Sequence, residues 1–229
     1  MPAASSKEDP QSDSGFRDWL VLVLMSLPWP EIMGEVWRII RQLARGMGDE
    51  GIYEVLSHEA ILDLKDKRGK SAKVRKLQTV RYLQNHIIAF QDQAWGDGDI
   101  LINYRCKPGK LVDRWRPGQK TYLLISLQET KHRGDTDEFE IEWGIRNGFL
   151  RENELWETEI RHRTKYLKMQ VIFPKARPPK QAWIGEHLSK KSEPLSEQKF
   201  EKLPDGRRLA TWEKKRPRLN ERYQLRWSW

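Results

Sequence analysis

Apolar and polar residues alternate through most of this chain, from about residue 51 to its end. The pattern is clearest at residues 121–127, 138–145 and 223–229, where every second residue is apolar and its neighbours are mostly polar or charged. A period of two places one set of side chains in a core and the other in water, which is typical of half-buried antiparallel strands. The pattern therefore predicts a mainly β fold, an antiparallel β-sandwich or open barrel, over residues 49–229.

Turn residues divide this region into short segments. Glycine- or proline-containing turns occur at residues 96–98, 107–109, 116–118, 146–148 and 203–206, and such residues supply the backbone angles that tight turns need. In the segment 155–173 the alternation changes phase, with Trp156, Ile160 and Tyr166 in one phase and residues 167–173 in the other. We expect a β-bulge there, where one long strand passes from one sheet to the other.

The first 48 residues have a different pattern. Residues 1–15 are small and polar and predict a disordered tail. Residues 16–48 predict a helical hairpin or an amphipathic helix, because apolar residues recur every three or four positions after Pro30. This segment could cover the β domain, dock on a partner or lie in a membrane interface, although Glu31 and Glu35 argue against the last. If this segment docks on a partner, the residues that we expect to contact it are Trp19, Leu22, Ile32, Val36, Trp37 and Ile40.

Composition limits the cell compartment and the kinds of metal site that we expect. The chain has eleven tryptophans and one cysteine, Cys106, so no disulfide can form within it, which favours a cytoplasmic location. A single cysteine excludes a cysteine-based zinc site, and the five histidines fall at no metal-ligand spacing. The longest apolar stretch is well short of the ~20 residues of a membrane span, so we expect no transmembrane segment. We therefore expect no cofactor and no metal, and the sequence leaves the oligomeric state open.

Positive charge is concentrated in the last third of the chain. Residues 151–229 carry 20 Lys and Arg against 11 Asp and Glu, an excess equal to the net charge of +9 of the whole chain. Basic side chains at this density attract phosphates or acidic partners. The alternative is a solvated sheet face whose cations pair with Glu138, Glu140, Glu142, Glu157 and Glu159. The candidate binding residues are Arg161, Arg163, Lys165, Lys168, Lys175, Arg177, Lys180, Arg207, Arg208, Lys214, Lys215 and Arg216.

One short segment carries an enzyme-like motif. Residues 123–131 form an apolar run that ends in Glu129-Thr130-Lys131, and this resembles the core of the PD-(D/E)xK nuclease superfamily. The resemblance implies that Asp113 and Glu129 would hold a divalent metal and that Lys131 would help to position water. The alternative is an exposed pair at a strand end, since the family continues into a helix whereas residues 137–145 alternate as a strand.

These observations lead to three functional hypotheses. The first is a non-catalytic interaction module that binds a protein partner through the N-terminal helix or the basic face. The second is a nucleic-acid-binding β protein that contacts the phosphate backbone through its basic final third. The third is a metal-dependent nuclease. The sequence favours a protein that is not an enzyme, because it contains no other catalytic motif.

Overall fold

The computed structural model describes residues 51–229. Contacts divide the chain into two units, Met1–Ala44 and Arg45–Trp229, and the described residues all belong to the second. The tail and the helical segment predicted for residues 1–48, with the six partner-helix residues, lie outside the described residues.

The described chain is mainly β. Its strands and its one short 3-10 helix, η1, run in the order β1 (Tyr53–Leu64), β2 (Ser71–Tyr82), β3 (Ile87–Ala94), β4 (Asp99–Lys107), β5 (Lys110–Trp115), β6 (Thr121–Lys131), β7 (Thr136–Arg146), β8 (Asn153–Glu159), β9 (Tyr166–Phe173), β10 (Gln181–Glu186), β11 (Lys191–Pro194), η1 (Glu197–Lys199), β12 (Phe200–Lys202), β13 (Arg208–Lys215) and β14 (Arg222–Ser228).

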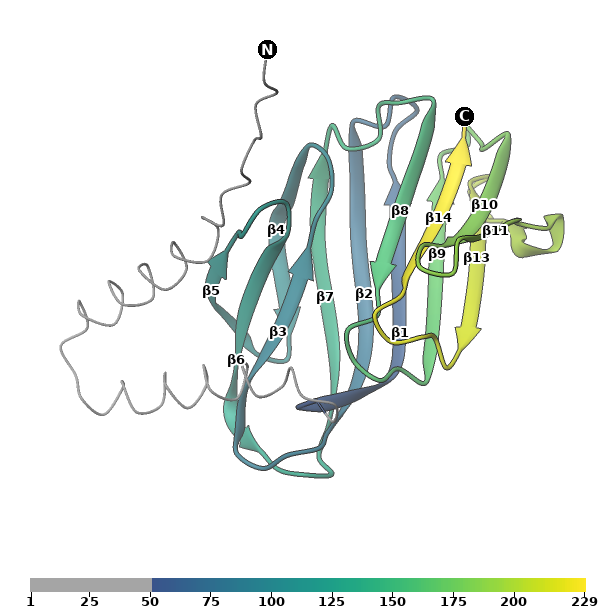
Figure 1. Cartoon of the computed structure of the whole chain (residues 1–229). Helices are drawn as coiled ribbons and strands as arrows, with labels where there is room; N and C mark the ends of the chain where they lie inside the picture. Colours follow the sequence, from purple (N-terminus) through teal and green to yellow (C-terminus); the bar gives the residue numbers. More distant parts are fainter. Residues whose placement is uncertain (1–50) are drawn as a thin grey trace, which may run out of the picture. The chain divides into compact units, whose positions relative to one another are not determined.

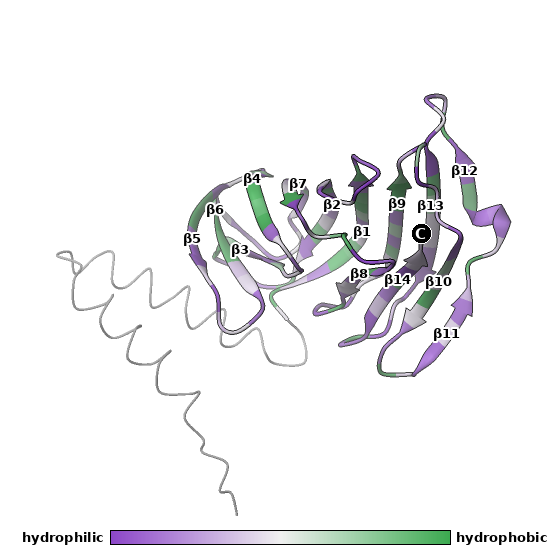
Figure 2. Ribbon diagram, turned by 90° about the horizontal axis from the view of Figure 1, so that it is seen from above, coloured by the Kyte–Doolittle hydropathy of each residue, from purple (hydrophilic) through white to green (hydrophobic). Residues whose placement is uncertain are grey.

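The strands form three sheets in a sandwich-like arrangement (Figure 1). The largest sheet has the order β12-β13-β9-β1-β2-β7-β4. The other two sheets, β11-β10-β14-β8 and β3-β6-β5, lie over different parts of one face of the large sheet (Figure 2). Neighbouring strands are antiparallel except for β1 and β9, which run parallel. The prediction of a mainly β fold is therefore confirmed, with three sheets and one parallel pair.

The core lies between the large sheet and the two smaller ones, and aromatic pairs join the layers. Phe90 of β3 stacks on Phe139 of β7, with ring centroids 4.0 Å apart. Phe173 of β9 meets Trp227 of β14 at 5.5 Å. Each of these four side chains is at most 2% exposed. Large aromatic side chains bury much apolar area each, which explains how a chain so rich in charge can still form a sizeable core.

Residues 155–173, where the alternation changes phase, do pass from one sheet to another. They do so as two separate strands and not as one strand with a bulge. The segment contains β8, in the four-stranded sheet, and β9, in the large sheet. The irregular residues 160–165 join them, and their backbone groups are bonded elsewhere: Ile160 N donates to Glu221 O, and Val55 N donates to Arg163 O. These external partners satisfy the backbone at the crossing, so the strand can break completely.

A long insertion separates β2 from β7 in the sequence, although the two strands are neighbours in the large sheet. Arg81 pairs with Thr136 at the end of that ladder. Beyond it, Tyr82 N donates to Asp135 O and Gly134 N donates to Tyr82 O, both at 2.9 Å. Residues 83–135, which contain β3 to β6, therefore leave the sheet and return to it at the same place.

The two smaller sheets face one another along β3 and β8, which form no backbone ladder. Side chains bridge this seam instead. Trp95 Nε1 donates to Glu157 at 2.7 Å, and Lys120 Nζ donates to Glu159 at 2.6 Å. Within residues 51–229, no helix is long and apolar enough to cross a membrane.

Candidate functional site

The parallel pair β1 and β9 brings two basic loops together. Residues 58–63 pair in register with residues 167–172, so the loops that follow the two strands, 65–70 and 174–180, leave the sheet at the same end. This is also the end at which β14 and the chain terminate (Figure 1). Arg177 ties the loops to each other, because its Nη1 donates to Lys67 O at 3.1 Å.

Asp66 shapes the first loop. Its carboxylate accepts hydrogen bonds from the backbone N–H groups of Arg68 at 2.7 Å and Ser71 at 2.6 Å. Burial alone would raise the pKa of Asp66, but these bonds outweigh it and the pKa is lowered. Gly69 has φ +69°, and a Cβ there would lie 1.6 Å from Phe149 O, so no other residue fits. The loop therefore presents the exposed side chains of Lys67, Arg68 and Lys70 to water.

The second loop is fixed by Arg177 and by a link to β14. The Arg177 guanidinium lies 4.2 Å from the ring centroid of Trp229, a cation–π contact that holds the side chain in place. Lys180 N donates to Ser228 O at 2.9 Å. Lys175, near the start of the same loop, is exposed. The loop thus has a constrained backbone and leaves Lys175 without a carboxylate partner among the described residues.

Cations from β12 and β13 complete this surface, because β13 runs antiparallel to β9 and begins at the same end. Carboxylates pair with some of them: Asp63 with Lys65 and Arg207, Glu197 with Arg208, and Glu152 with Lys180. Among residues 51–229, the other six cations have no carboxylate within ion-pair distance. We call the whole surface the basic end; its members are Lys65, Lys67, Arg68, Lys70, Lys175, Arg177, Lys180, Lys202, Arg207 and Arg208.

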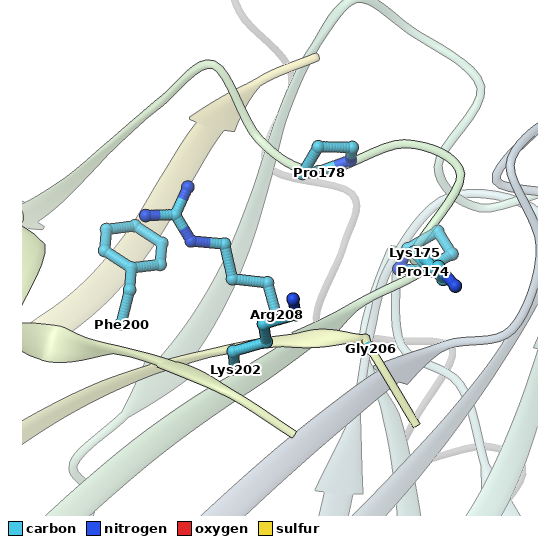
Figure 3. A pocket seen from close by; sticks show the side chains of 7 residues that line it. All are labelled: Pro174, Lys175, Pro178, Phe200, Lys202, Gly206 and Arg208. Atoms are coloured by element: carbon cyan, nitrogen blue, oxygen red, sulfur yellow. The ribbon is translucent and has the colours of Figure 1, made fainter. Parts of the chain in front are cut away.

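A hollow of about 380 Å³ lies in the basic end (Figure 3). Pro174, Lys175 and Pro178 come from the second loop, and Gly206 comes from the turn before β13. Phe200, Lys202 and Arg208 of β12 and β13 line the rest. The lining includes three cations and no carboxylate, so an anion is the ligand class that its charge favours.

The predicted basic residues do not form one surface. Lys175, Arg177, Lys180, Arg207 and Arg208 lie at the basic end. The others lie near the opposite end of β9 and β13, where Lys215 pairs with Tyr166 and Arg216 N donates to Lys165 O. The two groups are about 23 Å apart, since β9 has eight residues at ~3.3 Å each. The second group contains Arg161, Arg163, Lys165, Lys168, Lys214, Lys215 and Arg216.

Four of the seven cations in the second group pair with carboxylates, whereas Arg163, Lys215 and Arg216 have no carboxylate partner among residues 51–229. Arg161 pairs with Glu159 at 2.9 Å and Lys214 pairs with Glu186 at 2.7 Å. Longer contacts join Lys165 to Glu54 and Lys168 to Glu59. Two of the glutamates predicted to pair with these cations pair with β2 instead. Glu140 forms an ion pair with Arg75, and Glu142 forms one with Lys73. The alternative of a solvated, charge-paired face therefore describes this group better than the basic end.

The sequence prediction missed four members of the basic end that lack carboxylate partners. Lys67, Arg68, Lys70 and Lys202 are not among the candidate binding residues that the sequence indicates. The run Lys65-Asp66-Lys67-Arg68-Gly69-Lys70 was a signal of basic charge. What sequence spacing alone does not provide is the parallel pairing of β1 with β9, which brings this run to residues more than a hundred positions later.

In the nuclease-like motif, Asp113 lies apart from Glu129 and Lys131. Asp113 pairs in register with Leu124 of β6, five positions before Glu129, so about 16 Å of strand separates them. Lys131 is held by Glu129 at 2.5 Å and by the half-buried Asp137 at 2.7 Å. Within residues 51–229, no group of three or more histidine, cysteine or acidic side chains is placed to hold a metal ion.

A polar cluster lies between β2, β3 and β4. Lys76 of β2 and Asp92 of β3 form its ion pair, and Tyr104 Oη donates to Asp92 Oδ2 at 3.1 Å. Burial, and then the charge of Asp92, raise the pKa of the Cys106 thiol to about 12. A thiol of that pKa is protonated near neutrality, so the geometry does not support a nucleophilic role for Cys106.

Comparisons with known proteins found no matching family model and no matching curated protein. Among solved structures, the chain is similar to an M1 zinc metallopeptidase from Deinococcus radiodurans, with 10% identity and a TM-score of 0.45, over 78% of this chain and 42% of that one. It is also similar to a candidate protease from Parabacteroides distasonis, with 12% identity and a TM-score of 0.44, over 78% of this chain and 40% of that one. The chain thus spans about two fifths of the length of these structures.

Proposed function

We propose that this protein is a non-catalytic binding module whose basic end holds the phosphate backbone of nucleic acid. The observation that carries the proposal is the convergence of loops 65–70 and 174–180 on one end of the sheet. Six basic side chains without carboxylate partners gather there, and their combined charge attracts anions. Regularly charged polymers satisfy several such cations at once, which a small anion does not.

The arrangement supports backbone contact rather than base reading. Exposed lysines and arginines on loops neutralise phosphates and release counterions, so they favour affinity with little dependence on base sequence. Hydrogen bonds to Asp66 in one loop and from Arg177 in the other hold the loop backbones, so less order has to be gained on binding. The protein-partner hypothesis allows a partner on the N-terminal helix or on the basic face, and the test below separates nucleic acid from an acidic protein at these cations.

The test is fluorescence anisotropy with a labelled 20-nucleotide single strand and a labelled 20-base-pair duplex, measured over a series of salt concentrations. We expect affinity to fall linearly on logarithmic axes, with a slope of about −3.5 to −5.5 if four to six phosphates of a duplex are neutralised. The double variant Arg68→Glu/Lys175→Glu should lose at least tenfold in affinity at 100 mM salt and show a shallower slope.

The matched control is Arg163→Glu/Lys215→Glu, which makes the same charge change on exposed side chains near the opposite end of the sheet. It should keep most of the affinity of the parent protein. Equal losses in the two double variants would mean that net charge, rather than the basic end, governs binding. Binding of an acidic polypeptide such as poly-glutamate at lower concentrations than either nucleic acid would contradict the proposal.

A further inference from the structure

The hollow in the basic end is more specific than a charged surface. Two segments far apart in the sequence enclose it: the loop after β9, through Pro174 and Pro178, and the β12–β13 hairpin, through Phe200 and Arg208 (Figure 3). Its volume of about 380 Å³ is at the lower end of the ~300–1,000 Å³ of small-molecule sites. Its size is therefore that of a small-molecule group.

The charges in the hollow favour a phosphate with more than one negative charge. Lys175 and Lys202 have no ion-pair partner among the described residues, and the carboxylate that pairs with Arg208, Glu197, is 82% exposed and outside the lining. A phosphate monoester carries about −1.5 to −2 charges near neutrality and offers three acceptor oxygens. A diester within a strand carries one charge, so it matches this set of donors less well.

Flat and rigid groups line the same hollow. The Arg208 guanidinium lies 4.5 Å from the ring centroid of Phe200, so the two form a stacked pair. Pro174 and Pro178 lie on the other segment of the lining, and proline rings are rigid because φ is fixed. Aromatic rings and guanidinium planes are the surfaces on which nucleobases stack, at about 1–3 kcal/mol per base.

From this combination we infer that the hollow is a subsite for one nucleoside monophosphate unit, with its phosphate monoester at the lysines and its base against Phe200 and Arg208. The inference rests on the proposed function and deepens it, because a strand end that carries a terminal phosphate presents this unit. A free mononucleotide presents the same chemistry. The protein would then prefer phosphorylated strand ends to the interior of a strand.

The test compares three probes on the full chain by anisotropy and competition: a 12-nucleotide single strand with a terminal 5′-phosphate, the same strand with a 5′-hydroxyl, and free AMP as a competitor. A second pair of strands places the phosphate at the 3′ end. We expect at least a fivefold preference for one phosphorylated end over its hydroxyl counterpart, and displacement of that strand by AMP.

Two variants locate the effect. Lys202→Glu and Phe200→Leu should each abolish the preference for the phosphorylated end, the first through charge and the second through stacking. Lys199→Glu is the matched control for the first, because Lys199 is exposed on η1 and outside the hollow. It should keep the preference. The folding of each variant is checked by its thermal transition.

The outcomes for the subsite and for the proposed function are distinct. Salt-dependent binding with equal affinity for phosphate and hydroxyl ends would overturn the subsite and leave the proposed function in place. Binding of AMP that Lys202→Glu and Phe200→Leu abolish, without binding of either longer strand, would support the subsite and contradict the proposed function. A preference that persists in both variants would place the recognition elsewhere and overturn the inference.

Discussion

Lys76 and Asp92 form an ion pair that bridges the two layers of the sandwich. Lys76 Nζ lies 2.8 Å from Asp92 Oδ1, and the two side chains are only 14% and 5% exposed. Lys76 also donates to Gln93 O at 2.9 Å, and its Nζ lies 4.8 Å from the ring centroid of Trp143. A charge pair withdrawn from water is costly to form, and it is more costly to leave one partner alone.

Removing one partner should therefore be worse than removing both. We expect Asp92→Ala to lower the free energy of unfolding by about 3–5 kcal/mol, because an unpaired ammonium would remain buried. The double variant Lys76→Met/Asp92→Leu should be less destabilised than the single variant. Urea unfolding of the parent and the three variants, with Lys76→Met as the third, checks this expectation. Losses that simply add would show that the two side chains act independently.

Glu221 supplies a second stability test, with a defined dependence on pH. It is fully buried and accepts backbone hydrogen bonds from Leu188 at 2.7 Å and from Arg222 at 2.9 Å. Burial would raise its pKa, but these bonds reverse the effect and the pKa is lowered. We expect Glu221→Gln to cost about 1–3 kcal/mol at pH 7, since a carboxylate acceptor is lost from buried donors.

The sign of the pH effect follows from the lowered pKa. A carboxyl group with a lower pKa in the folded state stabilises the fold above its ordinary pKa, and this contribution disappears as pH falls through the folded value. The gap between the parent and Glu221→Gln in urea unfolding should therefore narrow toward acid. Glu201→Gln, at an exposed strand position, is the matched control and should show almost no gap. A gap that is constant from pH 7 to pH 3 would contradict the assignment.

Histidine burial should make the fold sensitive to mild acid. Burial, with a smaller contribution from Lys76, lowers the pKa of His58 to about 3, and burial lowers that of His162 to about 4. Both side chains stay neutral in the folded state, whereas the unfolded chain takes up protons below about pH 6.5. The free energy of unfolding should therefore fall as pH is lowered from 6.5 to 5.

The variant that checks this effect is His58→Gln, which cannot titrate. The decrease in unfolding free energy between pH 6.5 and 5 should be smaller in this variant than in the parent. A remainder is expected from His162. The exposed His187→Gln serves as the control and should retain the decrease seen in the parent. Equal decreases in His58→Gln and the parent would show that His58 is not the residue responsible.

Cys106 should be a slow thiol in the folded protein. Its pKa of about 12 leaves very little thiolate at pH 8, and the thiolate is the reactive form. We expect alkylation by iodoacetamide to be at least tenfold slower in the folded protein than in urea. Because Cys106 is the only cysteine, mass spectrometry of the intact chain reports the reaction directly. Similar rates in the two states would contradict the structure around this side chain.

Strands with one buried face could be predicted from the sequence, because burial imposes the period of two. Strands β6, β7 and β14 show this alternation, and all three contribute to the core. Strands β5 and β11 were missed, since nearly all of their residues are exposed and no alternation is required of them. The turns at residues 107–109 and 116–118 enclose β5 and could have revealed it.

Strand β2 shows no continuous apolar alternation, for the opposite reason. Its inner face includes the polar side chains Lys76 and Gln78, which interrupt the apolar pattern that the rest of the strand follows. Asp92, on another strand and in another sheet, pairs with Lys76 and so offsets the cost of burying its charge. The candidate site had the same limitation, because pairing between distant strands decides which basic residues share an end of the sheet.

The insertion of residues 83–135 also indicates where this fold can accept additional residues. The bonds between Tyr82 and residues 134 and 135 close it at its base, so β2 and β7 are related as the two arms of a hairpin with four strands inserted at its tip. Extra residues in the insert would increase the closure entropy by only ~0.6 kcal/mol per doubling of length. Growth at the turn around Gly118, where a side chain would meet open space, would leave the alignment of β1, β2 and β9 intact. The insert is therefore the part of the molecule where a new specificity could be added without disturbing the basic end.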